Sequence, residues 1–355
     1  MKLKYYKELD GIRAMAALMV IFFHFFSGVS SNNSFVLLLK KISIFGQTGV
    51  SLFFVLSGFL ITRILLEAKN KANYFSSFYV RRILRIIPLY YFFLIIFYFI
   101  VPLIFKSQVV SLNKQIYYWV YMQNFAMTFN WIAEGPLHFW SLAVEEHFYI
   151  FWPFVIYFFN NTKILYAIAV LVLISFFTRY FLLSNNYDVF YFTFSRLDEL
   201  ALGALLAIIE MKKYYFKLQN RIFSMLLVST LIISILIWFI NNASGNDYLQ
   251  IFKFLVLGLA YFAFIGYIIT SKNSNLLKKF FQLKIFSFTG RISYGLYVYH
   301  PLCFSMFYKF FMFNNIFLNF ICCLLLSFLF ATTSYYLIEV QFLKLKKYWN
   351  YAHAS

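Results

Sequence analysis

The sequence predicts an all-α polytopic membrane protein with about ten transmembrane helices and both termini in the cytoplasm. Of its 355 residues, 63% are hydrophobic and only 12% are charged, and the mean hydropathy is +0.75. Soluble domains carry about half apolar and about a quarter charged residues. A soluble fold of this length could not bury so much apolar surface, which excludes a cytosolic enzyme, a disordered chain and a fibrous protein.

Apolar runs of about 20 residues, the length that crosses a bilayer as a helix, define the candidate spans in chain order. The spans are 11–29, 46–66, 84–105, 140–159, 163–183, 194–211, 221–240, 250–270, 290–310 and 314–339.

The remaining segments complete the predicted organisation. Residues 115–132 alternate between aromatic and polar types, which favours an interfacial or re-entrant piece. The first apolar run is expected to be a retained helix, because Asp10 and Arg13 interrupt it and no small-x-small cleavage site follows. We expect one membrane domain over 1–345 and a short basic cytoplasmic tail over 346–355.

The net charge of +19 has a topological explanation. With the N-terminus inside, the predicted inner loops carry twenty Lys and Arg residues, and the outer loops carry four, namely Lys40, Lys41, Lys106 and Lys114. This asymmetry favours an even number of spans with cytoplasmic ends, and nucleic acid is not needed to explain the charge. The three cysteines form no CxxC motif, so neither a disulfide framework nor a metal site is indicated.

Two ionisable residues lie in the first predicted helix. Arg13 and His24 are eleven residues apart, so they share one helix face, with His24 about 16 Å further out. Ionisable groups inside a membrane are costly and often functional. For Arg13 alone an anchoring role is favoured, whereas His24, within the sequence IFFHFF, is favoured as a functional residue.

The third span begins with a basic cluster. Arg82 and Arg85 are three residues apart and project the same way. Paired guanidinium groups suit phosphate oxygens, so a phosphorylated cytosolic ligand is one interpretation, and flanking charge that sets the topology is the other.

The fourth span carries two carboxylates. Glu145 and Glu146 lie about 8 Å below the outer edge if the helix starts at Trp140. At that depth, at least one should face the interior and pair with a cation or a histidine. We expect Glu145 or Glu146 to orient His24, as a carboxylate orients the base in acyl transfer.

Later spans add further polar candidates. Arg196 and Asp198 begin the sixth span, and His300 lies near the middle of the ninth. For Gly49, Ser57 and Gly58 of the second span, close helix packing is the favoured interpretation.

These stretches together resemble acyltransferase family 3, the integral-membrane acyltransferases that modify bacterial surface polysaccharides. LDGIRAMAALMVIFFHF is similar to the family's first helix, with its Arg/Lys-x10-His motif at Arg13 and His24. The resemblance continues, in order, through GVSLFFVLSGFLITR, RRILRIIPLYY with Arg-x-x-Arg at Arg82 and Arg85, HFWSLAVEEHFYIFWP, RLDELALGALLA and ISYGLYVYH. Ser51 departs from the pattern, because an acidic residue is common there, and His147 replaces a frequent Gln.

The resemblance implies acyl-CoA, usually acetyl-CoA, as the acyl donor and a carbohydrate hydroxyl as the acceptor, and the sequence itself indicates no metal. It implies His24 as the catalytic residue with Arg13 beside it, and Arg82 and Arg85 at the CoA end. The other recurrent positions, whose roles are less defined, are Trp140, Ser141, Glu145, Tyr294 and His300. The chain is expected to be the form without an appended SGNH-type domain.

The resulting hypothesis is an O-acetyltransferase of the bacterial cytoplasmic membrane, with one cavity open to both sides. The acceptor is a surface polysaccharide or lipid-linked glycan, and O-antigen, capsule, exopolysaccharide and peptidoglycan are all compatible. His24 acts as general base or carries a transient acetyl group. The alternatives are a proton-coupled transporter or flippase for a glycan or small solute, and an enzyme that works wholly on the cytoplasmic side.

Overall fold

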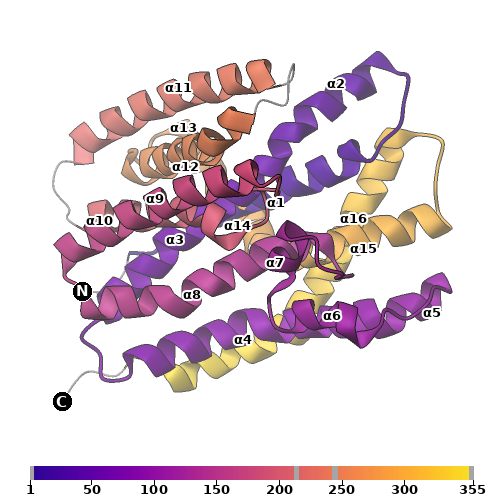
Figure 1. Ribbon diagram of the computed structural model, residues 1–355, viewed down its shortest axis with the longest axis horizontal. Coiled ribbons are helices and arrows are strands. Elements are labelled where there is room, and N and C mark those ends of the chain that lie inside the picture. The colour runs from indigo at the N-terminus through magenta and orange to yellow at the C-terminus, as the bar shows by residue number, and fades with distance from the viewer. Residues whose placement is uncertain (1–3, 212–215, 242–246, 352–355) are drawn as a thin grey trace.

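The computed structural model describes residues 4–211, 216–241 and 247–351, and the regular elements of this part of the chain are all helices (Figure 1). The predicted all-α class is confirmed. The long helices run alongside one another in a bundle. Lys2, Lys212, Lys213 and the last four residues of the predicted basic tail lie outside the described residues.

Each of the ten predicted spans coincides with a helical segment. They are α1 (Glu8–Ser27), α3 (Gly49–Ala68), α4 (Tyr74–Ile95) with a π-helical turn (Ile96–Ile100) and α5 (Val101–Phe105), α8 (Trp140–Phe158), α9 (Asn161–Ser184), α10 (Leu197–Met211), α11 (Phe216–Asn241), α12 (Asp247–Thr270), α15 (Ser293–Phe310), and α16 (Ile316–Ser334) with a second π-helical turn (Tyr335–Glu339) and α17 (Val340–Lys344). Shorter helices connect them, namely α2 (Ser34–Ser43), α6 (Leu112–Trp119), α7 (Gln123–Thr128), α13 (Leu276–Phe281) and α14 (Lys284–Arg291).

Within the described residues, seven helical stretches are long and apolar enough to cross a membrane. Those built on α8, α10 and α15 are not among them. α10 has only 15 residues, α8 contains two glutamates and α15 contains His300. The polytopic membrane character is therefore supported, and the count of ten crossings stays a prediction.

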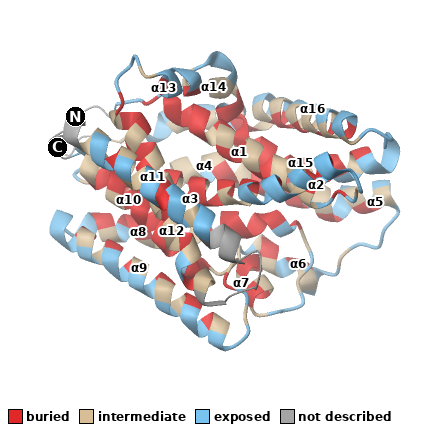
Figure 2. Cartoon of the chain, turned by 90° about the horizontal axis from the view of Figure 1, so that it is seen from above, coloured by how far each residue is buried: buried red, intermediate tan, exposed pale blue. Residues whose placement is uncertain are grey.

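The outer helices present apolar side chains to their surroundings, as lipid contact requires. In α9, Leu173 and Phe177 are 54% and 61% exposed, whereas Ile164 on another face is fully buried. Figure 2 shows the same pattern across the molecule, with exposed residues on peripheral helices such as α9 and α16 and buried ones toward the centre. Contact of these apolar side chains with water would be unfavourable, whereas contact with the hydrocarbon chains of a bilayer is not.

α3 and α10 cross at very close range because both contribute glycine at the crossing. A Cβ on Gly58 would lie 2.0 Å from the carbonyl oxygen of Leu200, and one on Gly203 would lie 2.0 Å from that of Val55. The helix-packing interpretation of Gly58 is therefore confirmed.

The two ends of the described chain lie at the same end of the bundle (Figure 1). The carbonyl oxygen of Lys4 accepts a hydrogen bond from Arg63 near the end of α3. Asn73, just before α4, donates to the carbonyl oxygen of Asn350. Both ends therefore flank the α3–α4 connection, as an even number of crossings requires, whereas the sidedness in a membrane stays a prediction.

Candidate active site

Helices α1, α3, α4, α8 and α15 surround a cavity of about 120 Å³, here called the arginine cavity. It is lined by Arg13, Val50, Phe53, Phe54, Ser57, Arg82, Arg85, Ile86, Ser141, Leu142, Glu145, Glu146, Tyr149, Ser293, Tyr294 and Tyr297.

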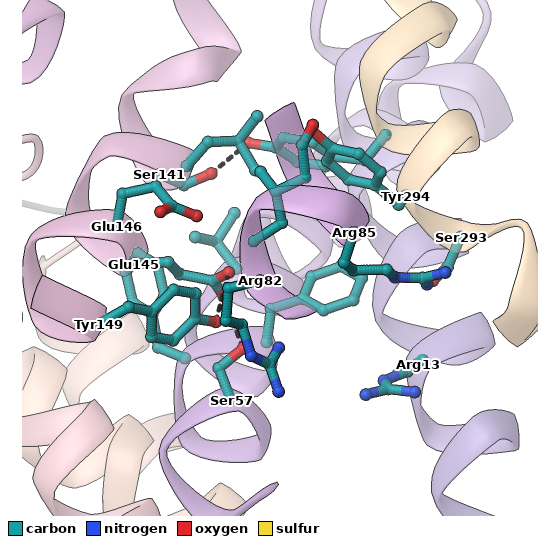
Figure 3. A pocket seen from close by; sticks show the side chains of 16 residues that line it. Arg13, Ser57, Arg82, Arg85, Ser141, Glu145, Glu146, Tyr149, Ser293 and Tyr294 are labelled. Atoms are coloured by element: carbon teal, nitrogen blue, oxygen red, sulfur yellow. Dashed lines mark hydrogen bonds between the residues drawn. The ribbon is translucent and has the colours of Figure 1, made fainter. Parts of the chain in front are cut away.

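Three guanidinium groups meet in this cavity, from α1 and from two successive turns of α4 (Figure 3). Arg13 has Asp10 at 3.5 Å, and Arg85 has Glu339 at 3.7 Å, both long for an ion pair. The Arg82 guanidinium packs against the ring of Tyr149, 5.5 Å from its centroid, and forms no carboxylate ion pair within the described residues. Under-neutralised guanidinium groups in a partly buried cavity indicate a site for an anion.

Arg81 is not part of the cavity lining. Its Nη1 donates to the carbonyl oxygens of Lys346 and Trp349, at 3.2 and 3.3 Å, and to Oδ1 of Asn350 at 3.1 Å. Arg81 therefore contacts residues 346–350 near the end of the described chain. Arg82 and Arg85 both face the cavity, in agreement with the prediction that they project the same way.

The two glutamates of α8 lie in the arginine cavity and do not contact His24. Glu145 accepts hydrogen bonds from Ser57 Oγ at 2.7 Å and from the Tyr149 hydroxyl at 3.0 Å (Figure 3). Oε1 of Glu146 is buried without a hydrogen-bond partner in the described chain. The expectation that one of these carboxylates orients His24 is therefore wrong in this structure.

His24 lines a second cavity between α1, α4, α5 and α15, here called the histidine cavity. It is lined by His24, Phe25, Gly28, Phe93, Phe97, Val101, Phe105, Ser107, Gly135, Pro136, Leu137, His138, Pro301, Leu302, Phe304, Ser305 and Tyr308.

His300 is the side chain that orients His24. Nδ1 of His24 lies 2.7 Å from Nε2 of His300, and Nδ1 of His300 lies 3.0 Å from the carbonyl oxygen of Leu296. A carbonyl can only accept, so His300 Nδ1 carries the proton, and neutral His300 must accept from His24 through Nε2. His24 then donates from Nδ1, which leaves its Nε2 unprotonated and able to act as a base.

A third histidine, His138, belongs to the same cluster, although the sequence did not single it out. Its Nε2 donates to the carbonyl oxygen of Val298 at 3.1 Å, and its ring centroid lies 5.4 Å from that of His300. Glu145 is seven residues further along, about 10 Å deeper into the bundle. The short 3-10 turn Leu137–Phe139 before α8 therefore brings His138, and not Glu145, to the level of His300. The sequence feature that could have identified His138 is its position two residues before the predicted span 140–159.

A polar layer separates the two cavities. The Tyr297 hydroxyl donates to the His138 carbonyl oxygen at 2.5 Å, and Ser141 Oγ lies 2.6 Å from the same hydroxyl. Because the Tyr297 proton is used by the carbonyl, Ser141 is the donor in that second contact. The two cavities share no lining residue. The expected single cavity open to both sides is thus two cavities with Ser141, Tyr297 and His138 between them.

The other predicted candidates divide between the cavity and the packing around it. Tyr294 lines the arginine cavity and donates to the carbonyl oxygen of Ile86. Trp140 is buried, with its ring 5.9 Å from that of Phe54.

Arg196 and Asp198 line neither cavity. Arg196 pairs with Glu199 at 2.8 Å and also donates to Ser51, and Asp198 pairs with Arg179 at 2.8 Å. These side chains are fully or almost fully buried and tie α9, α10 and α3 together. Their position indicates a packing role and not contact with a substrate.

A family model described as an acyltransferase domain matches residues 6–336. The O-acetyltransferase OatA of Staphylococcus aureus strain NCTC 8325 / PS 47 is 31% identical over 321 residues, covering 84% of this chain and 50% of the relative. SACOL0978 of Staphylococcus aureus strain COL, whose name also contains the term O-acetyltransferase, is 29% identical over 367 residues, covering 97% of this chain and 58% of the relative. The chain thus spans about half the length of these curated relatives. No solved structure matches it.

Proposed function

The chain belongs to the acyltransferase domain family, and on that premise we propose that it is a multi-pass O-acetyltransferase of the bacterial cytoplasmic membrane. It transfers an acetyl group from cytosolic acetyl-CoA to a hydroxyl of a cell-envelope or secreted polysaccharide. The observation that carries the proposal is that two neighbouring cavities contain different functional groups, one suited to binding an anion and the other to accepting a proton. One gathers Arg13, Arg82 and Arg85, and the other contains His24 with an unprotonated Nε2.

The arginine cavity is the donor site. Acetyl-CoA carries several phosphate groups, and guanidinium groups hold phosphate oxygens through two parallel hydrogen bonds. Arg82 is available for this because no carboxylate competes for it within the described residues. Arg82 follows Arg81, which contacts the C-terminal end of the described chain, and the distribution of Lys and Arg along the sequence favours a cytoplasmic position for that end.

His24 is the general base. The acceptor hydroxyl gives its proton to His24 Nε2 while its oxygen forms a bond to the thioester carbonyl carbon. The tetrahedral intermediate collapses as the carbon–sulfur bond breaks. The CoA thiolate takes the proton back from His24, so the products are the acetyl ester and free CoA. His300 stabilises the charged imidazolium through its Nε2, which accepts from His24 Nδ1.

The reaction requires a movement of the side chains that separate the two cavities. The acetyl group has to pass from the arginine cavity to His24, and the hydrogen-bonded side chains of Ser141 and Tyr297 lie between them. Displacing the Tyr297 ring toward the arginine cavity, which it already lines, would join the two cavities. The acceptor then meets the thioester in the histidine cavity.

A direct assay tests the proposal. Purified protein in detergent is given acetyl-CoA, with and without a polysaccharide or lipid-linked glycan acceptor, and free thiol and acetylated glycan are measured. Acceptor-dependent release of CoA with formation of an equal amount of acetyl ester is expected. An intact thioester with every glycan tested would contradict the proposal, and movement of an unmodified glycan by the same protein in sealed liposomes would favour the transporter alternative.

A further inference from the structure

A segment that follows the last long helix is fixed against the beginning of α4. Residues 345–351, here called the clamped segment, are held by the three hydrogen bonds of Arg81 and by the hydrogen bond from Asn73 to Asn350. The Tyr351 ring also faces the Arg81 guanidinium, 6.0 Å from its centroid. The clamped segment therefore lies beside the first turns of α4, from which Arg82 and Arg85 reach into the arginine cavity.

One lysine of this region is less exposed than its neighbours. Lys344 and Lys347 are exposed, and Lys347 packs over Tyr348. Lys346 is half-buried and lies seven residues after Glu339, whose carboxylate pairs with Arg85 of the arginine cavity. The Arg81 hydrogen bond to the Lys346 carbonyl oxygen thus fixes the backbone of this half-buried lysine beside α4.

Several cations held close together are electrostatically unfavourable when no anion is bound among them. Arg13, Arg82 and Arg85 repel one another and the nearby Lys346. Among the described residues, Asp10 and Glu339 at long ion-pair distances, and Glu145 and Glu146 of the cavity lining, offset part of this repulsion. Repulsion between cations in a partly desolvated site falls sharply once a polyanion binds among them. The clamp by Arg81 keeps the backbone of Lys346 beside this group of cations.

We propose that the clamped segment is a wall of the donor site, in which Lys346 binds a phosphate group of acyl-CoA and Arg81 is a positioning residue that holds it there. This inference rests on the proposed function, because acyl-CoA is the polyanion of that reaction. It adds a binding residue from outside the first helices of the bundle, and it gives Arg81 a task distinct from that of Arg82.

The test compares two acetyl donors in the purified full chain. Acetyl-CoA carries the nucleotide phosphates, whereas S-acetyl-pantetheine carries none. Lys346→Ala should raise KM for acetyl-CoA by about tenfold or more, with little change in kcat, because one charge-assisted contact is lost. KM for S-acetyl-pantetheine should not change. Lys346→Arg should keep most of the affinity, and Arg81→Ala should act in the same direction as Lys346→Ala.

Lys347→Ala is the matched control, since it removes a neighbouring charge that points to solvent. If Lys346→Ala and Lys347→Ala give the same KM for acetyl-CoA as wild type, the clamped segment is not part of the donor site. If Lys346→Ala weakens both donors equally, the effect is structural and the inference also fails. A wild-type protein that does not use acetyl-CoA would instead overturn the proposed function, which keeps the two failures distinct.

Discussion

Nδ1 of His24 on α1 lies 2.7 Å from Nε2 of His300 on α15, and the Leu296 carbonyl oxygen sets the direction of that hydrogen bond. One backbone acceptor therefore determines the tautomer of two histidines in succession. In many acyl-transfer sites a carboxylate fixes the base, but here a neutral imidazole does so. The consequence is an unprotonated Nε2 on a histidine that lines the histidine cavity.

His24→Ala should abolish acetyl transfer while the protein still folds and inserts. General-base catalysis contributes about 100-fold to 10,000-fold, so residual activity should be at most about 1%. The measurement is the O-acetyl content of the cell-surface glycan by NMR, at matched expression. His147→Gln is the control, because His147 contacts Thr193 and lines neither cavity. Unchanged acetylation in His24→Ala would remove this residue from the mechanism.

His300→Leu should lower kcat by roughly 10-fold to 100-fold and change KM little, since it removes a hydrogen bond to a charged partner in the transition state. His300→Gln should restore part of the rate, because its side-chain oxygen can accept from His24 Nδ1. Steady-state kinetics of both variants provide the check. Equal rates for Leu and Gln would show that His300 only fills space.

Arg82→Ala should weaken acetyl-CoA binding by about 1.5–3 kcal/mol, or roughly 10-fold to 150-fold in Kd. Arg82→Lys should recover only part of this, because lysine cannot make the forked contact with phosphate. Binding of acetyl-CoA to the detergent-purified variants is the measurement, with Arg221→Ala as an exposed cationic control. An unchanged Kd in Arg82→Ala would leave the cluster as a topological anchor only.

Asp198→Ala should destabilise the protein by about 3–5 kcal/mol, because Arg179 would remain as a fully buried charge without its partner. The double variant Arg179→Met/Asp198→Leu should be more stable than Asp198→Ala alone. Thermal unfolding in detergent measures both. A wild-type unfolding temperature in Asp198→Ala would contradict the packing role assigned to this pair.

Much of the bundle was predictable because apolar run length reports membrane helices directly. The predicted start of the third span at residue 84 was late, however, since α4 begins at Tyr74. Its first turns carry arginines and serines, and a hydropathy pattern cannot distinguish polar helical turns at a membrane surface from a loop. The same limit hid α13 and α14, which are short and basic.

Within the candidate site, spacing along one helix was informative and contacts between helices were not. The facing of Arg13 and His24 followed from helix periodicity, and the structure keeps both on the side of α1 that meets α4 and α15. The partner of His24 depended on the relative heights of α1, α8 and α15. An error of about two helical turns exchanged Glu145 for His300 and His138, because sequence alone does not give the relative heights of helices in a bundle.

The most direct test of the two-cavity account uses the protein in sealed liposomes with acetyl-labelled acetyl-CoA on the side of the chain ends, and an acceptor glycan on the opposite side. Free CoA should accumulate on the donor side, while the label appears as an acetyl ester on the glycan across the membrane. Movement of unmodified glycan without CoA release would contradict the acyltransferase account. Labelled glycan formed only on the donor side would keep the chemistry but contradict the assignment of the two cavities to opposite faces.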